Sequence, residues 1–228
     1  MPRLAATLTI GQAPRPDITP ILEAHWPTQV ECLHVGLLDG LSRPEIEARF
    51  GARPGDALLM TRLLDGTAVT LGKSAVAEGL QRAVDDLEAR GCELIVLLCT
   101  GDFQHLGCRN AWLVEPDRVL PPVVSALAQA RQTGIIVPLI EQADSEARKW
   151  APLAKPPIYE AAVPYDAGLD ELARSAKTLA ARGAQMLVLD CMGFTERHRA
   201  CASEASGLPV VLSNAVIARL LPELVQPS

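Results

Sequence analysis

Two cysteines, Cys99 and Cys191, occupy matching positions in the chain, where their thiols could serve as a paired acid and base. Each cysteine follows a short apolar run and comes two residues before a glycine, a pattern typical of a strand that ends in a turn. Backbone N–H groups at such a turn stabilise a thiolate. Two opposed thiols could remove a proton from one face of a carbon and return it on the other. That chemistry inverts a stereocentre and needs no cofactor.

The segments that carry these cysteines are copies of one another. Without a gap, 8 of 15 positions are shared between LEARGCELIVLLCTG, from Leu87 to Gly101, and LAARGAQMLVLDCMG, from Leu179 to Gly193. Each copy predicts a helix that stops at an Arg-Gly pair, then a buried strand, then the cysteine. The duplication indicates two similar lobes with one thiol on either wall of a cleft.

A carbanion formed between two thiols needs fixed hydrogen-bond donors and a group that binds its substrate. The turns after the cysteines are expected to supply backbone N–H groups and close approach, at Thr100, Gly101, Met192 and Gly193. Gln12 and Arg15 follow the first predicted strand, where a guanidinium could hold a substrate carboxylate in bidentate fashion. The alternative for Arg15, a solvated loop charge between two prolines, stays equally open.

Four further residues are candidates with weaker grounds. His198 and Glu196 follow the second cysteine and could tune its thiol, although a surface position is the commoner role for such residues. Ser213 and Asn214 end the last predicted strand, where they could cap the final helix, line the cleft, or do both.

The elements that must position these residues alternate between strand and helix patterns along almost the whole chain. This alternation predicts an α/β fold with mainly parallel sheets flanked by helices. We expect an N-terminal lobe from residues 1–114 and 208–228, carrying Cys99, and a C-terminal lobe from residues 115–207, carrying Cys191. The site then lies in the cleft between the lobes, because ligands bind at the carboxyl ends of parallel strands.

Two local signals stand out in the N-terminal half. Ser42 and Glu45 match a capping box that opens a helix ending near Phe50. Asp65 and Gly66 separate two apolar runs, which is a strong signal for a β-hairpin. An antiparallel ribbon is therefore expected beside the parallel sheet of the first lobe.

Composition narrows the classes of function. The 228 residues have a formal net charge of −6 and 4% aromatic residues, which argues against nucleic-acid binding. The chain begins without a signal-peptide pattern and contains no apolar run of membrane-spanning length, so we expect a cytoplasmic protein with no membrane partner. The cysteines are expected to be free thiols, and none has zinc spacing, so no metal and no cofactor is expected. Buried, unreactive roles are assigned to Cys32, Cys92, Cys108 and Cys201.

Motifs spread along the chain resemble a known family. They are TIGQAPRPDI (Thr9 to Ile18), CRNAWLVEPDRVLPP (Cys108 to Pro122), IVP (Ile136 to Pro138), LDCMGF (Leu189 to Phe194) and LPVVLSNAVIARL (Leu208 to Leu220). Together with a cysteine after a strand in each of two lobes, these stretches resemble the AroM family within the Asp/Glu racemase superfamily. The resemblance implies a two-lobed fold and proton transfer by thiols at an activated carbon.

The sequence departs from the amino-acid racemases of that superfamily. Those enzymes resemble one another in an Asp-Ser pair and in Cys-Asn-Thr and Cys-Thr-His motifs. The equivalent positions here read Gly11-Gln12, Cys99-Thr100-Gly101 and Cys191-Met192-Gly193. Both thiols are kept while the substrate contacts have changed, which argues against a plain glutamate or aspartate racemase.

Three hypotheses follow from these patterns. The first is a cofactor-independent racemase, epimerase or isomerase of a small carboxylate or cyclic amide. The second is a decarboxylase or other lyase that uses the same cysteine pocket, and the third is a non-catalytic small-molecule binding or regulatory protein. A homodimer is left open as the oligomeric state.

Overall fold

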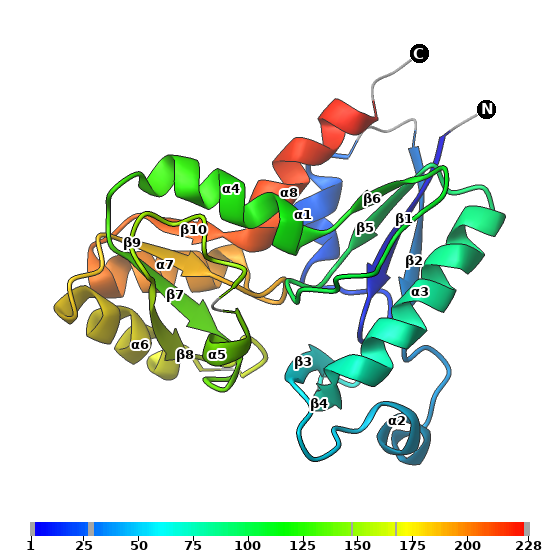
Figure 1. Cartoon of the computed structure of the whole chain (residues 1–228), viewed down its shortest axis with the longest axis horizontal. Coiled ribbons are helices and arrows are strands. Elements are labelled where there is room, and N and C mark those ends of the chain that lie inside the picture. Colours follow the sequence, from blue (N-terminus) through cyan, green and yellow to red (C-terminus); the bar gives the residue numbers. More distant parts are fainter. Residues whose placement is uncertain (1–2, 27–29, 147, 167, 226–228) are drawn as a thin grey trace.

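Strands and helices alternate in the computed structural model, which describes residues 3–26, 30–146, 148–166 and 168–225. Figure 1 shows two lobes side by side, each with its own sheet and flanking helices. The predicted α/β architecture with mainly parallel sheets is confirmed. Within the described residues, none of the helices is both long and apolar enough to cross a membrane.

The sheet of the first lobe has four parallel strands in the order β2-β1-β5-β6. Their bounds are Arg3–Thr9 for β1, Val30–Gly36 for β2, Leu94–Leu97 for β5 and Trp112–Val114 for β6. Every residue of β5 is buried, because the strand is central and covered on both faces. Helix α3, Lys73–Ala89, covers one face with an apolar stripe of Val76, Leu80, Val84 and Leu87.

The sheet of the second lobe repeats this plan in the order β10-β9-β7-β8. Its strands are β7 (Thr133–Val137), β8 (Ile158–Ala161), β9 (Met186–Leu189) and β10 (Val210–Leu212). Helices α6 (Asp170–Ala181) and α7 (Glu196–Ser206) pack side by side against it. As with β5, all four residues of β9 are buried.

The two copies of the duplicated segment fold alike. Gly91 and Gly183 stop the preceding helices with φ of +87° and +92°, a conformation that favours glycine. The next residue in each copy donates to a helix carbonyl, at 3.1 Å to Leu87 O and 3.0 Å to Leu179 O. This shared turn directs β5 and β9 into equivalent central positions, so their carboxyl ends carry equivalent residues.

A hairpin and a short helix are added to the first lobe, with the hairpin on the side of the second lobe. Strands β3 (Leu58–Arg62) and β4 (Ala68–Gly72) pair in antiparallel fashion around Gly66, whose φ is +88°, as predicted. Helix α2, Arg43–Phe50, begins with the predicted capping box, in which the Ser42 N–H donates to Glu45 at 2.8 Å. Figure 1 shows the hairpin at the lower edge of the gap between the lobes.

Three helices join the lobes. They are α1 (Thr19–Glu23), α4 (Pro116–Ala128) and α8 (Ser213–Leu220), the last followed by the 3₁₀ turn η1 (Leu221–Leu224). Helix α8 packs against both α1 and α4, and one apolar cluster runs from Ala5 and Val96 of the first sheet to Val188 of the second. The lobes therefore share a continuous core.

One part of the predicted lobe division is wrong. Strand β10 pairs with β9, so residues 210–212 belong to the second sheet rather than to the N-terminal lobe. Pairing gives the backbone groups of the strand their hydrogen-bond partners, and only the following helix α8 returns toward the first lobe.

Two short elements, β6 and α5 (Gln142–Glu146), were also not predicted, since three to five residues give little periodicity.

Candidate active site

Cys99 and Cys191 line the same pocket, which lies between the lobes at the carboxyl ends of β5 and β9. The pocket has a volume of about 30 Å³. Thr100, Gly101 and Met192 also line it, as predicted. The apolar part of the wall is formed by Ile10, Leu59, Met60, Leu98, Val137 and Pro138. The pocket is therefore narrow, with both cysteines in its wall.

The turns that hold the two sulfurs are equivalent. Cys99 Sγ accepts the N–H of Gly101 at 3.4 Å, and Cys191 Sγ accepts the N–H of Gly193 at 3.4 Å. A hydrogen bond to sulfur favours the thiolate. These two N–H groups were expected to face a substrate, and the structure gives them the cysteine sulfurs as acceptors instead. At Cys191, the Gly193 N–H acts to lower the pKa of the thiol.

The Cys191 thiol lies under opposing influences. Burial raises its pKa, while the Gly193 N–H, the charge of Arg15 and the hydroxyl of Tyr165 act to lower it. The net direction is upward, opposite to the thiolate expected from the turn alone. The Cys191 thiol therefore keeps its proton at neutral pH.

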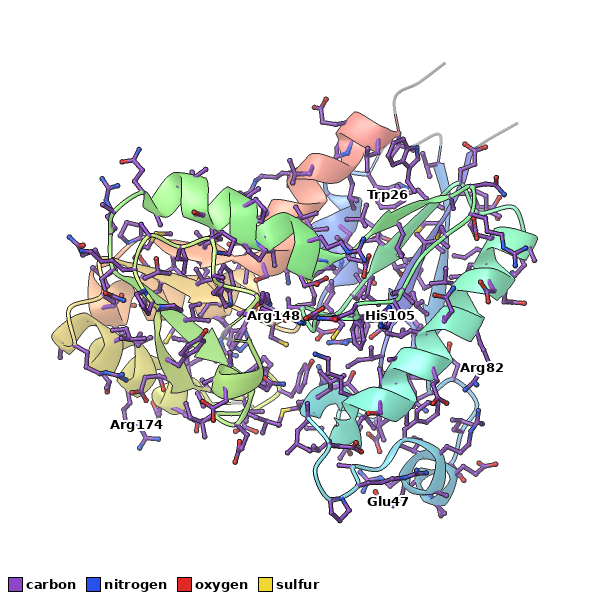
Figure 2. All side chains as sticks on the ribbon, viewed as in Figure 1. Trp26, Glu47, Arg82, His105, Arg148 and Arg174 are labelled. Atoms are coloured by element: carbon purple, nitrogen blue, oxygen red, sulfur yellow. The ribbon has the colours of Figure 1, made fainter. Side chains whose placement is uncertain are left out.

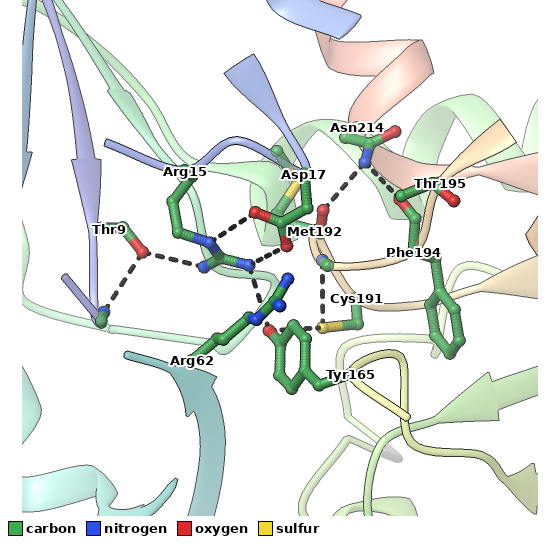
Figure 3. A network of polar contacts seen from close by, with 12 residues as sticks. Thr9, Arg15, Asp17, Arg62, Tyr165, Cys191, Met192, Phe194, Thr195 and Asn214 are labelled. Atoms are coloured by element: carbon green, nitrogen blue, oxygen red, sulfur yellow. Dashed lines mark hydrogen bonds and ion pairs between the residues drawn. The ribbon is translucent and has the colours of Figure 1, made fainter. Parts of the chain in front are cut away.

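Arg15 is buried at the pocket wall, with 4% of its surface exposed. Its Nε and Nη2 donate to the two oxygens of Asp17 at 2.9 and 2.7 Å, and Nη1 donates to Thr9 Oγ1 at 3.1 Å. Nη2 also lies 3.3 Å from the hydroxyl of Tyr165, which belongs to the other lobe (Figure 3). The interpretation of Arg15 as a solvated loop charge is therefore wrong.

Tyr165 is a site residue that the sequence did not indicate. Its hydroxyl lies 4.0 Å from Cys191 Sγ, and Figure 3 shows it between this sulfur and the guanidinium of Arg15. Burial, followed by the nearby Cys191, raises the pKa of the phenol, so it keeps its proton. The ring packs directly on Gly193, where an added Cβ would lie 2.5–2.8 Å from ring atoms.

A buried lysine ties the turns of the two lobes together. Lys149 Nζ donates to both oxygens of Asp190 at 2.8 and 2.7 Å, and to the carbonyl of Thr100 at 2.8 Å. The side chains of Lys149 and Asp190 are 2% and 1% exposed. Trp150 Nε1 also donates to Asp190 at 3.1 Å, and Thr100 Oγ1 donates to the Asp190 carbonyl at 3.2 Å. The Asp190 carboxylate is structural, as expected from its place before Cys191.

Two more contacts cross between the lobes. Gln142 of α5 donates to the carbonyl of Leu58 in β3 at 3.1 Å, which joins the second lobe to the hairpin. Arg148 forms an ion pair with Asp102, in the loop that follows the Cys99 turn. Figure 2 shows Arg148 at the boundary between the lobes. The pocket is thus bounded by polar contacts from both sides.

Gln12 supports the site from outside the pocket. Its Nε2 donates to the carbonyl of Leu38 at 3.2 Å, and its Oε1 accepts the N–H of Leu64 at 2.9 Å. These bonds attach the loop after β1 to the β3–β4 hairpin. Gln12 is not among the residues that line the pocket, so its predicted contact with substrate stays a prediction, and the structure gives it this bracing role.

Ser213 and Asn214 are fully buried and hold the loop that carries Cys191. Ser213 Oγ donates to Leu189 O at 2.7 Å, and Asn214 Nδ2 donates to Met192 O at 2.8 Å and Phe194 O at 2.6 Å. Helix α8 begins after Leu212 without a side-chain cap. Both residues lie in the first turn of α8, after the N-cap residue Leu212, and neither is among the residues that line the pocket, so the structure places them in a role other than helix cap or cleft lining.

His198 and Glu196 belong to helix α7 rather than to the pocket. His198 is buried, and its Nδ1 accepts the N–H of Thr195 at 2.9 Å, which completes a capping box. Burial lowers the pKa of His198, and Arg197 adds to this effect. Glu196 lies at the surface and pairs with Arg199 at 2.5 Å. The predicted tuning of the thiol by these two residues is therefore not supported by their positions.

Compared with known protein families, the chain matches the family described as AroM protein over residues 5–225. The chain belongs to the AroM family. Comparison with curated protein sequences gives no match.

Solved structures similar to this AroM chain include racemases and an isomerase. Allantoin racemase from Klebsiella pneumoniae has a TM-score of 0.63 at 13% identity, with 98% of this chain and 87% of that chain covered. Glutamate racemase from Aquifex pyrophilus has a TM-score of 0.62 at 13% identity, covering 98% and 84%. Maleate isomerase from Pseudomonas putida S16 has a TM-score of 0.61 at 8% identity, covering 97% and 93%. At these identities the likeness shows a shared fold, the Asp/Glu racemase type, as predicted.

The residues missed in this AroM chain share one property. Tyr165 follows β8 and Lys149 lies in the long connection between β7 and β8, so both enter the site from segments without a cysteine or a repeat. The rule that ligands bind beyond the carboxyl ends of parallel strands points to the segment after β8 and could have indicated Tyr165. No comparable signal marks Lys149.

Proposed function

We propose that the chain is a racemase, epimerase or isomerase that needs no cofactor, with Cys99 and Cys191 as its acid and base. The observation that carries this proposal is that both thiols line one pocket at equivalent turns of two duplicated units. The fold shared with two racemases and an isomerase supports the same class of reaction. The substrate is a small molecule with a hydrogen on a carbon next to a carboxylate or amide carbonyl.

In the proposed cycle one sulfur begins as a thiolate and the other as a thiol. The thiolate takes the proton of the substrate carbon, which forms an S–H bond and leaves an enolate. The thiol then gives its proton to the opposite face of the same carbon and becomes a thiolate. One C–H bond breaks and one forms, so the step balances without an electron donor or acceptor.

The surroundings of Cys191 suit this alternation. Its raised pKa favours the thiol that donates, while the Gly193 N–H and the buried charge of Arg15 stabilise the thiolate that remains after donation. The phenol of Tyr165 keeps its proton and lies 4.0 Å from the same sulfur. Cys191 thus has surroundings that favour the thiol before donation and groups that stabilise the thiolate after it, as a proton donor in such a cycle requires.

The test is exchange of substrate hydrogen in heavy water by the Cys99→Ser and Cys191→Ser variants. A panel of small chiral carboxylates and cyclic amides is incubated with each protein, and deuterium uptake is measured separately for each enantiomer. We expect either variant to lose interconversion of enantiomers by at least about 100-fold, because each face then lacks its acid or base. Exchange of one enantiomer should survive, since the other thiol still serves one face.

Cys108→Ser is the matched control, because this half-buried thiol lies outside the pocket lining. It should leave both activities unchanged. A Cys99→Ser or Cys191→Ser protein that interconverts enantiomers at the wild-type rate would contradict the two-thiol mechanism. Release of carbon dioxide with protonation on a single face would instead indicate a lyase, and ligand binding without exchange would indicate a binding protein.

A further inference from the structure

The buried cations at the pocket already have carboxylate partners. Arg15 donates through Nε and Nη2 to both oxygens of Asp17, and the two side chains are 4% and 10% exposed. Lys149, beside the pocket, is paired in the same bidentate way with Asp190. Buried ion pairs of this geometry neutralise one another and resist separation.

The rest of the pocket wall supplies no counter-charge. Among the lining residues that the structure describes, Arg15 and Asp190 are the charged ones, and each belongs to one of these pairs. The remaining wall is uncharged: apolar side chains are joined by the neutral polar groups of Thr61, Thr100, Gln142 and Tyr165. Among these lining residues an anion would lose its hydration without meeting a cation that lacks a carboxylate partner.

The thiol chemistry adds to this cost. The proposed function requires one thiolate in the pocket. The positive charge of Arg15, although paired with Asp17, acts to lower the pKa of Cys191 and so favours its negative form. A substrate carboxylate would be a second negative charge in the same narrow space, and charges of like sign repel strongly where water is excluded. Transfer of its α-proton to the thiolate would then place two negative charges on one small substrate.

We infer that the site takes substrates whose reacting carbon is flanked by uncharged carbonyl groups, such as amides or imides, and that Asp17 sets this preference by neutralising Arg15. The inference rests on the proposed function and narrows its substrate class. A neutral amide or imide leaves the thiolate as the pocket's only added charge. It also offers carbonyl oxygens to which the phenol of Tyr165 can donate.

The wild-type protein tests this with a matched pair of probes. 5-Methylhydantoin is a neutral ring, and N-carbamoylalanine is its ring-opened anionic counterpart with the same stereocentre. Deuterium uptake at that carbon, corrected for the uncatalysed rate, gives kcat/KM for each, and calorimetry gives their affinities. We expect kcat/KM and affinity to favour the neutral probe by at least about tenfold.

The outcomes separate this inference from the proposed function. Equal or faster exchange with the anionic probe overturns the charge preference and leaves the two-thiol proposal standing. Binding of the neutral probe with no exchange of either supports the charge preference and contradicts the enzyme. Failure to bind or exchange either probe overturns the substrate class.

The variant Asp17→Asn tests the assigned role of Asp17. It keeps an acceptor for Arg15 and removes the neutralising charge, so the ratio of neutral to anionic kcat/KM should fall by at least about tenfold. Asp86→Asn removes a carboxylate from an exposed pair with Arg90 and serves as the control, with an unchanged ratio. An unchanged ratio in a folded Asp17→Asn protein overturns the role of Asp17. The wild-type comparison decides the substrate class even if this variant fails to fold.

Discussion

At Cys191, burial and hydrogen bonding act on one thiol in opposite directions. The sulfur is packed between the Gly193 turn and the Tyr165 ring, so its acidity depends on how closely these two groups approach. Sequence reasoning located both cysteines correctly at one pocket, because a duplicated strand-to-turn junction fixes where they lie. It could not locate Tyr165, because the approach of a ring to a glycine is decided by tertiary packing.

The Gly193→Ala variant should separate these two groups. The added Cβ would lie 2.5–2.8 Å from Tyr165, so the ring must move away from Cys191. We expect a loss of about 1–3 kcal/mol in the free energy of unfolding, typical of overpacking, together with a fall in exchange activity. Gly107→Ala is the control, because its Cβ would meet nothing within 4 Å. Denaturant unfolding and deuterium uptake measure both effects, and wild-type values for Gly193→Ala would show that the ring position is unimportant.

His198 should make stability depend on pH in a mildly acidic range. Its Nδ1 accepts the Thr195 N–H, and burial lowers its pKa below the ordinary value of about 6.5. The unfolded chain therefore takes up the proton first, so its contribution to stability is complete above about pH 6.5 and is lost as the pH falls through the folded pKa.

The variant His198→Gln keeps a side-chain acceptor at the same position of the capping box and does not titrate. Unfolding midpoints measured between pH 8 and pH 5 should therefore decline less for this variant than for the wild-type protein. Parallel curves for the two proteins would rule out His198 as the source of the pH dependence.

At the scale of elements, most of the fold was predictable because each helix and strand carries its own local signal. The hairpin around Gly66, the capping box of α2 and the Gly stops before β5 and β9 are examples. Strand β10 was assigned to the wrong lobe because its local sequence predicts a strand but not the strand with which it pairs. That pairing, with β9, depends on contacts between residues far apart in the chain. The function of α8 was missed for a related reason, since its first residues turn inward to the Cys191 loop.

The Asn214→Ala variant should show what α8 does for that loop. It removes two buried hydrogen bonds, to Met192 O and Phe194 O, and leaves both carbonyls without their side-chain donor. We expect a loss of about 1–3 kcal/mol in unfolding free energy and a reduced exchange rate, because the loop also positions Cys191. Unfolding and exchange assays check this, with Ser206→Ala as a comparison that also removes two hydrogen bonds, to Ala202 O and from the Leu208 N–H, remote from the pocket. Equal effects of the two variants would argue against a special role for Asn214.

At the scale of the whole molecule, the lobes are joined by a shared apolar core and by polar contacts around the pocket. Lys149 is central to these polar contacts, because its ammonium reaches the Thr100 carbonyl of the first lobe and the Asp190 carboxylate of the second lobe. Sequence patterns indicated two lobes but not this tie, since a single lysine in a connecting segment carries no periodic signal.

The Lys149→Met variant should leave the Asp190 carboxylate buried without its charge partner. Removing one member of a buried ion pair costs about 3–5 kcal/mol, so a large fall in unfolding free energy is expected. The double variant Lys149→Met, Asp190→Asn should recover part of the loss, because the unpaired charge is then gone. Arg90→Met, which breaks an exposed pair with Asp86, should change stability by less than about 1 kcal/mol. A Lys149→Met protein as stable as wild type would mean that the tie contributes nothing to holding the lobes.

The pocket volume has a consequence for the speed of uptake. About 30 Å³ accommodates roughly two water molecules, which is too little for any amide or carboxylate with a stereocentre. We therefore expect a ligand to enter a form in which the lobes lie farther apart, and its association rate constant is then that of the open form multiplied by the fraction of molecules in that form. Stopped-flow mixing should then show binding well below the diffusion limit, and loosening the Lys149 tie should accelerate it even as the fold becomes less stable.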